Sequence, residues 1–222
     1  MSKHPITIIA IDGGAATGKS STSCAIAKKL EFLHVDTGAH YRTVTFALNQ
    51  AGISPKDLDA VTEGLETLNL GTSVKGQQAF LSINGHEPND SEIRSPHVNG
   101  AVAYFAAISS VRKFLFEYQR GQVKMAQKHG FKGLVMEGRD IGSVIFPDAP
   151  FRFYLHADAE TRSLRRKKQG QEDAIQQRDA IDTSRKEAPL KCPEGAIVVD
   201  TSEHTLEQVI ALFLQIIRNP QD

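Results

Sequence analysis

Residues 13–20 read Gly-Gly-Ala-Ala-Thr-Gly-Lys-Ser and match the pattern G-x-x-x-x-G-K-[ST]. An apolar run over residues 6–11 precedes them and a helix-like stretch over residues 19–30 follows, which is the context that a phosphate-binding loop needs. The glycines let backbone N–H groups converge on phosphate oxygens, and the following helix adds its positive end. Lys19 supplies a cation, and the hydroxyl of Ser20 suits Mg²⁺. The segment therefore predicts a site for a nucleoside polyphosphate.

The residues expected at this site follow the loop into the first turn of the helix. They are Gly13, Gly14, Ala15, Ala16, Thr17, Gly18, Lys19, Ser20 and Ser21.

Two carboxylates follow expected strands at the places where a ligand would lie. In an open parallel sheet, ligands bind beyond the carboxyl ends of the strands. Asp36 comes directly after residues 32–35, and Glu137 comes directly after residues 133–136. With Ser20, these side chains form the expected Mg²⁺ site, because a carboxylate there can reach the ion or its water shell. A helix N-cap or a solvated turn is the simpler alternative for both.

Six arginines are expected at strand ends or on helices that can face the same crevice. Planar guanidinium groups are natural partners of phosphoryl oxygens, but any one of them could instead be a surface charge. The run over residues 162–168 has one apolar residue, Leu164, and is also typical of an exposed helix face. The six are Arg42, Arg112, Arg139, Arg162, Arg178 and Arg185.

Short apolar runs alternate with amphipathic stretches along the chain, which predicts an α/β fold with five parallel strands flanked by helices. The strands are expected over residues 6–11, 32–35, 133–136, 151–155 and 196–199. Helices are expected over 19–30, 39–50, 158–168, 172–187 and 205–218, with a long pair within 92–129.

Residues 72–90 break this alternation. They hold Asn84-Gly85, a strong hairpin signal, between two short runs of strand-forming residues. No linker or repeat separates independent domains. We therefore expect residues 1–222 to form one unit, with residues 64–100 as a small excursion from its core.

The composition excludes several classes of protein. Among 222 residues, 40% are hydrophobic, and 26 Lys and Arg balance 26 Asp and Glu, so no net field gathers nucleic acid or an anionic membrane. Cys24 and Cys192 have neither metal-ligand nor redox spacing. No segment resembles a signal peptide or a membrane span. These features predict a cytoplasmic protein, which we expect to be a monomer.

Beyond the phosphate loop, four blocks resemble the bacterial cytidylate kinases in order and spacing. They are residues 36–42, residues 92–94, the segment Gly-Arg-Asp-Ile-Gly at 138–142 with Phe-Pro-Asp-Ala-Pro at 146–150, and Arg178-Asp179 ahead of Asp182, Arg185 and Ala-Pro-Leu at 188–190. The resemblance covers almost the whole chain. It implies a P-loop kinase core with a nucleotide-binding insert at 64–100 and a short helical lid at 158–178.

The resemblance also implies roles for matching residues. Lys19 and Ser20 would handle the phosphates of ATP and Mg²⁺, and Arg42, Arg139 and Arg185 would hold the acceptor monophosphate. The expected catalytic residues are Lys19, Arg139, Arg178 and Arg185.

Other matching residues would surround the rest of the acceptor. Asp182 would take ribose hydroxyls beside Arg178, whereas Arg112 and Asp140 would read the cytosine ring. Arg162 would belong to the lid over ATP. The remaining acceptor residues are Asp36, Thr37, Tyr41 and Ala103.

The chain departs from the family pattern at two places. Ala103 stands where the family usually has a serine that helps to hold the base, and the stretch over residues 166–178 is shorter than in long-lid members. Gly170 could be a flexible point of the lid, although a C-cap glycine is the alternative.

The implied reaction transfers the γ-phosphoryl group of ATP to CMP, and to dCMP, with assistance from Mg²⁺. Kinases acting on both uridylate and cytidylate, or on shikimate, would share this core. A nucleotide-gated switch is an alternative from another class, but the N-K-x-D pattern of a GTPase switch is absent from the sequence.

Overall fold

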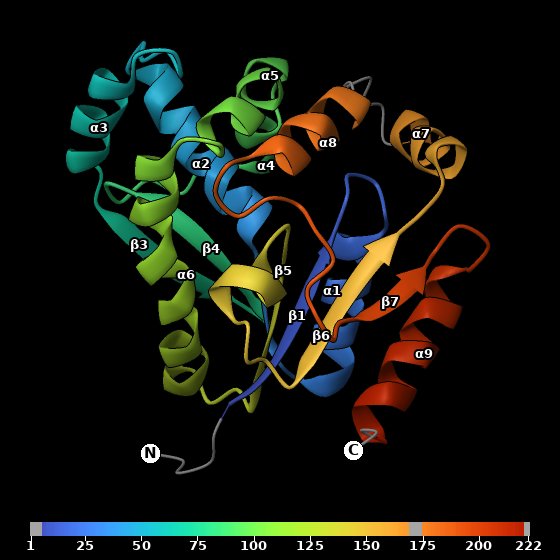
Figure 1. The fold of residues 1–222 in the computed structure, drawn as a ribbon. Helices are drawn as coiled ribbons and strands as arrows, with labels where there is room; N and C mark the ends of the chain where they lie inside the picture. Colours follow the sequence, from blue (N-terminus) through green and yellow to red (C-terminus); the bar gives the residue numbers. More distant parts are fainter. Residues whose placement is uncertain (1–5, 169–174, 220–222) are drawn as a thin grey trace.

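The computed structural model describes residues 6–168 and 175–219 of the chain (Figure 1). Within them, seven strands form one sheet in the order β3-β4-β2-β5-β1-β6-β7, and every neighbouring pair is parallel except β3 and β4. The strands are β1 Thr7–Gly13, β2 Leu33–Asp36, β3 Leu70–Lys75, β4 Gln78–Ile83, β5 Gly133–Gly138, β6 Phe151–His156 and β7 Ile197–Asp200.

Helices cover both faces of this sheet (Figure 1). They are α1 Lys19–Leu30, α2 Thr37–Gln50, α3 Leu58–Glu66, α4 Asp90–Ile93, α5 Pro96–Phe105, α6 Ser109–Lys128, the π-helical turn η1 Ile141–Ile145, α7 Ala159–Lys168, α8 Ile175–Ser184 and α9 Leu206–Arg218. The expected pair within residues 92–129 is α5 and α6, and the short helix α4 comes just before them. Gly170 and residues 172–174 of an expected helix lie outside the described residues, as does part of the expected lid.

The central strands are buried on both faces, as their near-continuous apolar runs predict. Ile9 and Ile11 of β1 pack with α1 and α9, whereas Ala10 between them belongs to the cluster under α6 and η1. Phe153 of β6 stacks on Phe213 of α9 with ring centroids 4.0 Å apart. Successive side chains of β1 and β5 thus pack on opposite faces of the sheet, which fixes the position of both strands. The loops that follow their carboxyl ends form the site.

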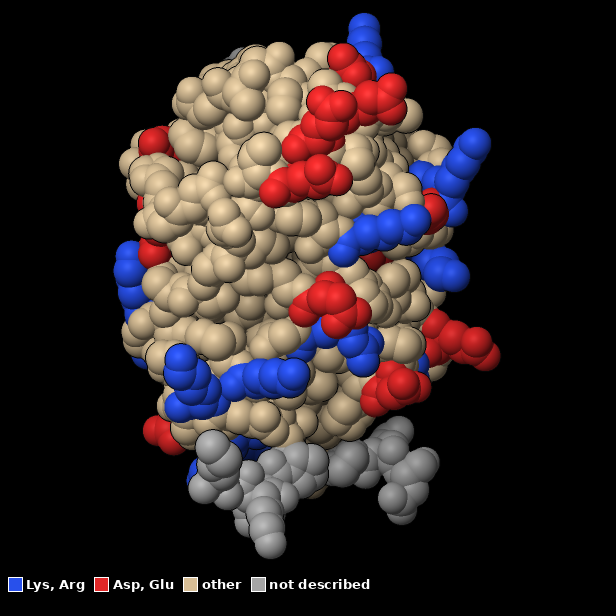
Figure 2. Space-filling model, turned by 90° about the vertical axis from the view of Figure 1, so that its left-hand side faces the viewer, with Lys and Arg blue, Asp and Glu red and all other residues tan. Residues whose placement is uncertain are grey.

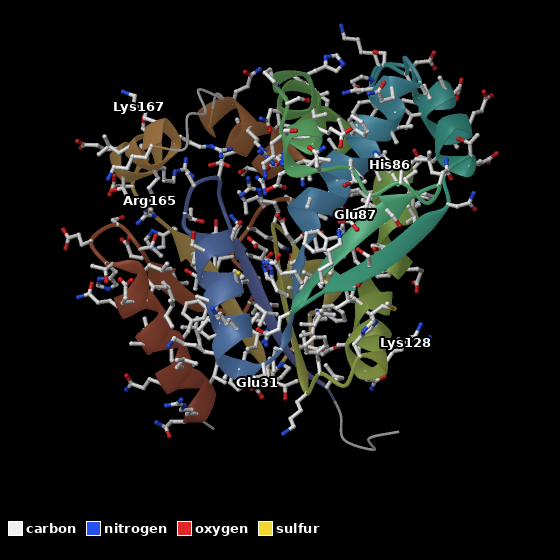
Figure 3. All side chains as sticks on the ribbon, turned by 180° about the vertical axis from the view of Figure 1, so that it is seen from behind. Glu31, His86, Glu87, Lys128, Arg165 and Lys167 are labelled. Carbon is white, nitrogen blue, oxygen red and sulfur yellow. The ribbon has the colours of Figure 1, made fainter. Side chains whose placement is uncertain are left out.

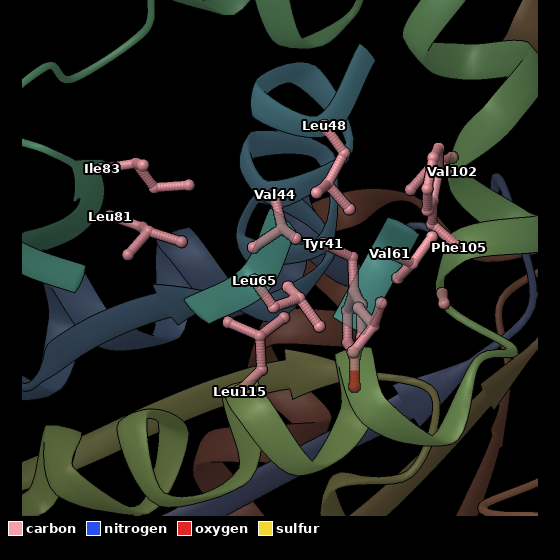
Figure 4. Packing of buried hydrophobic residues seen from close by; sticks show 12 residues of the cluster. Tyr41, Val44, Leu48, Val61, Leu65, Leu81, Ile83, Val102, Phe105 and Leu115 are labelled. Carbon is pink, nitrogen blue, oxygen red and sulfur yellow. The ribbon is translucent and has the colours of Figure 1, made fainter. Parts of the chain in front are cut away.

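A third cluster packs α2 against α3, α5, α6 and the hairpin β3–β4 (Figure 4). Val44, Phe105 and Leu115 are fully buried in it. Burying each such side chain contributes about 1.5–3 kcal/mol. The cluster therefore fixes α2 and α5 relative to the sheet, and both helices border the pocket described below.

The prediction of five strands is wrong, because the hairpin joins the sheet. Gln78 and Ala79 of β4 pair in parallel with His34 and Val35 of β2, and β3 then pairs with β4. Without β4, the backbone groups along that side of β2 would form an open sheet edge. Residues 72–83 therefore extend the core sheet, where the sequence predicted a separate antiparallel pair.

Charged side chains of both signs are interspersed on the face shown in Figure 2. No helix of the described residues combines the length and the hydropathy needed to cross a membrane.

Candidate active site

The phosphate-binding loop lies between β1 and α1, as predicted. Gly13 has φ of +150°, and a Cβ there would lie 2.1 Å from the carbonyl oxygen of Leu155, so only glycine fits. Lys19 Nζ folds back over the loop and donates a hydrogen bond to the Gly14 carbonyl at 2.6 Å. Burial and then the charge of Arg139 lower the pKa of Lys19 to about 7. A bound polyanion would restore its positive charge.

Glu137 connects this loop to the end of β5. Its Oε2 accepts a hydrogen bond from Ser20 Oγ at 2.8 Å, and its Oε1 lies 3.0 Å from His34 Nε2. The residue is buried, so the alternative of a solvated turn is wrong. Hydroxyl and carboxylate oxygens are the ligands that Mg²⁺ prefers when it keeps several waters, so Ser20 and Glu137 fit such an ion.

Asp36 acts as the N-cap of α2, which confirms the simpler alternative for this residue. Its Oδ1 accepts a hydrogen bond from Ala39 N at 3.1 Å, and its Oδ2 lies 3.7 Å from Arg94 Nη2. It also borders the pocket, so its expected contact with Mg²⁺ stays a prediction.

One pocket beyond the carboxyl ends of β1, β2 and β5 brings most of the expected residues together. Those that line it are Ala15, Ala16, Lys19, Ser20, Asp36, Thr37, Tyr41, Arg42, Ala103, Glu137, Arg139, Asp140, Arg178, Asp182 and Arg185. Of the other expected residues, Gly13, Gly14, Thr17, Gly18, Ser21, Arg112 and Arg162 are not part of this lining. Ser21 is exposed on α1.

Arg42 projects into this pocket from α2 and is only 4% exposed. Its Nη1 is buried without a hydrogen-bond partner, and within residues 6–168 and 175–219 no ion pair to it is found. Burial and then Arg94 lower the pKa of Arg42 to about 10. Because the guanidinium group of Arg42 is buried and its Nη1 has no hydrogen-bond partner, the binding of an anion beside it would be favourable.

Asp182 of α8 holds two of the expected acceptor arginines. Its Oδ2 accepts a hydrogen bond from Arg139 Nε at 2.8 Å, and its Oδ1 accepts one from Arg185 Nη2. Arg139 also donates to the Gly13 carbonyl. This network places the two guanidinium groups together between the phosphate loop and α8.

Arg112 and Asp140 form a buried pair at the other end of the pocket. Arg112 comes from α6, also donates to the Ala106 carbonyl at 3.1 Å, and lies 5.4 Å from the ring centroid of Tyr41. Burial raises the pKa of Asp140, although Arg112 opposes the shift. Arg112 does not line the pocket itself but pairs with Asp140, which does. Ala103 is part of the same lining.

The arginines of α7 do not all point into solvent. Arg162 bonds to Asp179, and Arg165 lies 3.4 Å from the Ala16 carbonyl and donates to the Thr201 carbonyl at 2.6 Å. Figure 3 shows Arg165 on the side of α7 towards the loop, whereas Lys167 points outwards. The exposed-face alternative is therefore wrong for Arg162 and Arg165.

Four residues of this region were not among the site residues predicted from the sequence. Arg94 and Arg166 line the pocket. Asp179 contacts the phosphate loop, and Asp12 is fully buried at the end of β1. The position of Asp12 at a strand end is the signal that identified Glu137 and could have identified it too. No local sequence pattern places α8 over the phosphate loop.

Asp12 fastens the turn that carries Arg139 and Asp140. Its two oxygens accept hydrogen bonds from Ile141 N and Gly142 N, both at 2.7 Å. Burial nevertheless raises the pKa of Asp12 from 3.8 to about 7. A carboxyl with a raised pKa in the folded state stabilises the fold most below its unfolded pKa, and the effect is lost as the pH rises through the folded value.

We expect the Asp12→Asn variant to gain stability relative to the unmutated protein as the pH rises from 4 to 8. The difference in the free energy of unfolding should change by on the order of 4 kcal/mol, because each unit of pKa corresponds to about 1.4 kcal/mol. Urea unfolding of both proteins at pH 4.5, 6 and 8 measures it. Asp140 and Lys19, which face Asp12, are common to both proteins. Parallel pH profiles would contradict this assignment.

Comparison with known proteins agrees with this geometry. The family model for cytidylate kinase matches residues 9–219. The chain is 40% identical to the cytidylate kinase of Mycobacterium avium (strain 104), with 95% of each chain covered. It is 38% identical to that of Caldanaerobacter subterraneus subsp. tengcongensis, covering 95% of this chain and 94% of the relative. With the phosphate loop and the arginine-lined pocket in place, these matches show that the chain belongs to the cytidylate kinase family.

Proposed function

We propose that this protein transfers the γ-phosphoryl group of ATP to CMP, and to dCMP, in a reaction assisted by Mg²⁺. The phosphate loop would hold the donor, and the pocket beyond β2 and β5 would hold the acceptor. The observation that carries the proposal is Arg42, a buried guanidinium group with an unpartnered Nη1 that faces the same pocket as Lys19. An acceptor phosphate would supply the missing partner.

Phosphoryl transfer requires no covalent intermediate with the protein, which acts mainly by positioning the substrates and stabilising charge. A nucleoside monophosphate is already ionised near neutral pH, so its oxygen can attack the γ-phosphorus without a general base. Lys19, Arg139 and Arg185 would spread the charge that develops on the transferred group, and they hold the two polyanions in line. Bound at Ser20 and Glu137, Mg²⁺ would neutralise charge on the donor phosphates.

The arrangement at Asp140 supports a cytosine base. Cytosine presents an exocyclic amino group where uracil presents a carbonyl, and a carboxylate can accept a hydrogen bond only from the former. Asp140 forms a buried ion pair with Arg112. Loss of either side chain would leave the other charge buried without a partner, which is costly. This pair favours a pyrimidine nucleotide over the carbocyclic acid of a shikimate-type kinase.

The acceptor is identified by measuring ADP release with CMP, dCMP, UMP, AMP and shikimate in turn. We expect CMP and dCMP to be used best. Release with shikimate alone, or equal release with CMP and UMP, would replace the proposal by one of the alternatives.

We expect Arg42→Ala to raise the KM for CMP by about 30- to 10³-fold, because a charge-assisted contact to phosphate is worth on the order of 2–4 kcal/mol. The KM for ATP should change little, since the donor lies at the loop. Steady-state kinetics with each substrate varied separately measures the split. Lys128→Ala is the matched control, since Lys128 is exposed at the far end of α6 (Figure 3). An unchanged KM for CMP would return Arg42 to a structural role.

A further inference from the structure

Asp179 of α8 lies against the phosphate loop, 164 residues away along the chain from Ala15. Its Oδ1 accepts a hydrogen bond from Ala15 N at 3.0 Å and lies 3.7 Å from Arg139 Nη2. Its Oδ2 accepts one from Arg162 Nη1 at 2.5 Å. A loop N–H and two guanidinium groups are the groups that bind phosphoryl oxygens in such proteins. The carboxylate therefore occupies a site built for an anion.

The contact is close because residue 14 is glycine. A Cβ on Gly14 would lie 2.6 Å from Arg162 Nη1 and 3.0 Å from Asp179 Oδ2. The pair thus rests directly on the loop backbone. Lys19 is near enough for the negative charge of Asp179 to raise its pKa, against the larger effect of burial. Asp179 is partly exposed, with 16% of its side chain accessible, so it can leave without opening the core.

A phosphoryl group and a carboxylate cannot share one N–H group, and two anions at this distance repel each other. We propose that Asp179 is a further functional residue of the donor site, where its carboxylate competes with the terminal phosphoryl group of the nucleoside triphosphate for Ala15 N, Arg162 and Arg139. The inference rests on the proposed function in that the loop binds ATP. Binding of the donor displaces the carboxylate and transfers both arginines to phosphate.

The same displacement would reach the acceptor half of the site. Asp182 lies three residues further along α8, where it holds Arg139 and Arg185. A shift of α8 away from the loop therefore changes how both arginines are held. Donor binding and acceptor binding become linked through one helix, and the linkage acts in both directions.

The test is direct binding of ATP and ADP, with Mg²⁺ and without acceptor, measured by calorimetry on the full chain. We expect Asp179→Asn to bind ATP about 5- to 20-fold more tightly than the unmutated protein, because the side chain keeps its shape and loses its charge. The gain for ADP should be smaller, since ADP lacks the terminal phosphoryl group. Glu187→Gln, which removes one negative charge beside Ser109, should leave both affinities unchanged.

The sign of the effect separates the proposal from a structural role. If Asp179 only positioned Arg162, the variant would bind ATP more weakly, and weaker or unchanged binding overturns the inference. Asp179→Ser is measured beside it and should also tighten ATP binding, in case the asparagine variant does not fold. Failure of the unmutated protein to bind ATP at all would instead overturn the proposed function.

Discussion

Replacing Lys19 by alanine is expected to lower kcat/KM by at least ~10³-fold without unfolding the protein. Lys19 belongs to none of the three apolar clusters, and among the described residues its ammonium group donates hydrogen bonds to Gly14 and Thr17 of the loop. Its lowered pKa shows that the charge is destabilised where it lies. Removing it therefore costs the fold little but takes a cation away from the phosphate loop.

Two measurements check this expectation together. A coupled assay for ADP release gives kcat/KM, and a thermal scan should give a midpoint within about 3 °C of the unmutated protein. Lys128→Ala serves again as the control, because it removes one exposed lysine far from the loop. Normal turnover by Lys19→Ala would remove the phosphate loop from the mechanism.

The second large effect is expected at Asp140, on the choice between CMP and UMP. A site that hydrogen-bonds a polar group can reject an analogue lacking it by as much as ~10⁴-fold, because its buried partner is left unpaired. We expect the unmutated protein to prefer CMP and Asp140→Ala to lose most of that preference. Ala103→Ser should increase it, because the added hydroxyl lies in the same lining.

The quantity to compare is the ratio of kcat/KM for CMP to that for UMP at saturating Mg·ATP. Removing Asp140 leaves Arg112 buried without its ion-pair partner, so we also expect a loss of about 3–5 kcal/mol in stability. The ratio does not depend on the folded fraction, because both substrates meet the same enzyme. Intact discrimination by Asp140→Ala would show that the base is read elsewhere.

Local signals predicted the elements at the centre of the site. The phosphate loop, β1, β2 and β5 were expected within one or two residues of their bounds, because runs of apolar residues determine buried parallel strands. Asp36 and Glu137 were identified as candidate site residues because ligands of parallel sheets bind beyond the carboxyl ends of the strands. The same rule applied to β1 would have found Asp12.

The rest depends on contacts between distant parts of the chain. Helix α3 has an N-cap at Asp57 and apolar residues at Val61 and Leu65, but its nine residues are too short for periodicity alone to stand out. The pairing of β4 with β2 joins residues more than forty positions apart. The contact of Asp179 with Ala15 depends on where α8 packs, which no local pattern determines.

The strand order has a consequence for synthesis of the chain on the ribosome. β1 is made first, yet its neighbours in the sheet are β5 and β6, which are made more than a hundred residues later. Until residues 133–138 emerge, the backbone groups of β1 have neither strand partner, and until residue 156 emerges they lack the second one. The phosphate loop is thus among the first segments translated and among the last to reach its final shape. A nascent chain acquires an anion-binding loop only when the residues that complete the pocket are nearly all present.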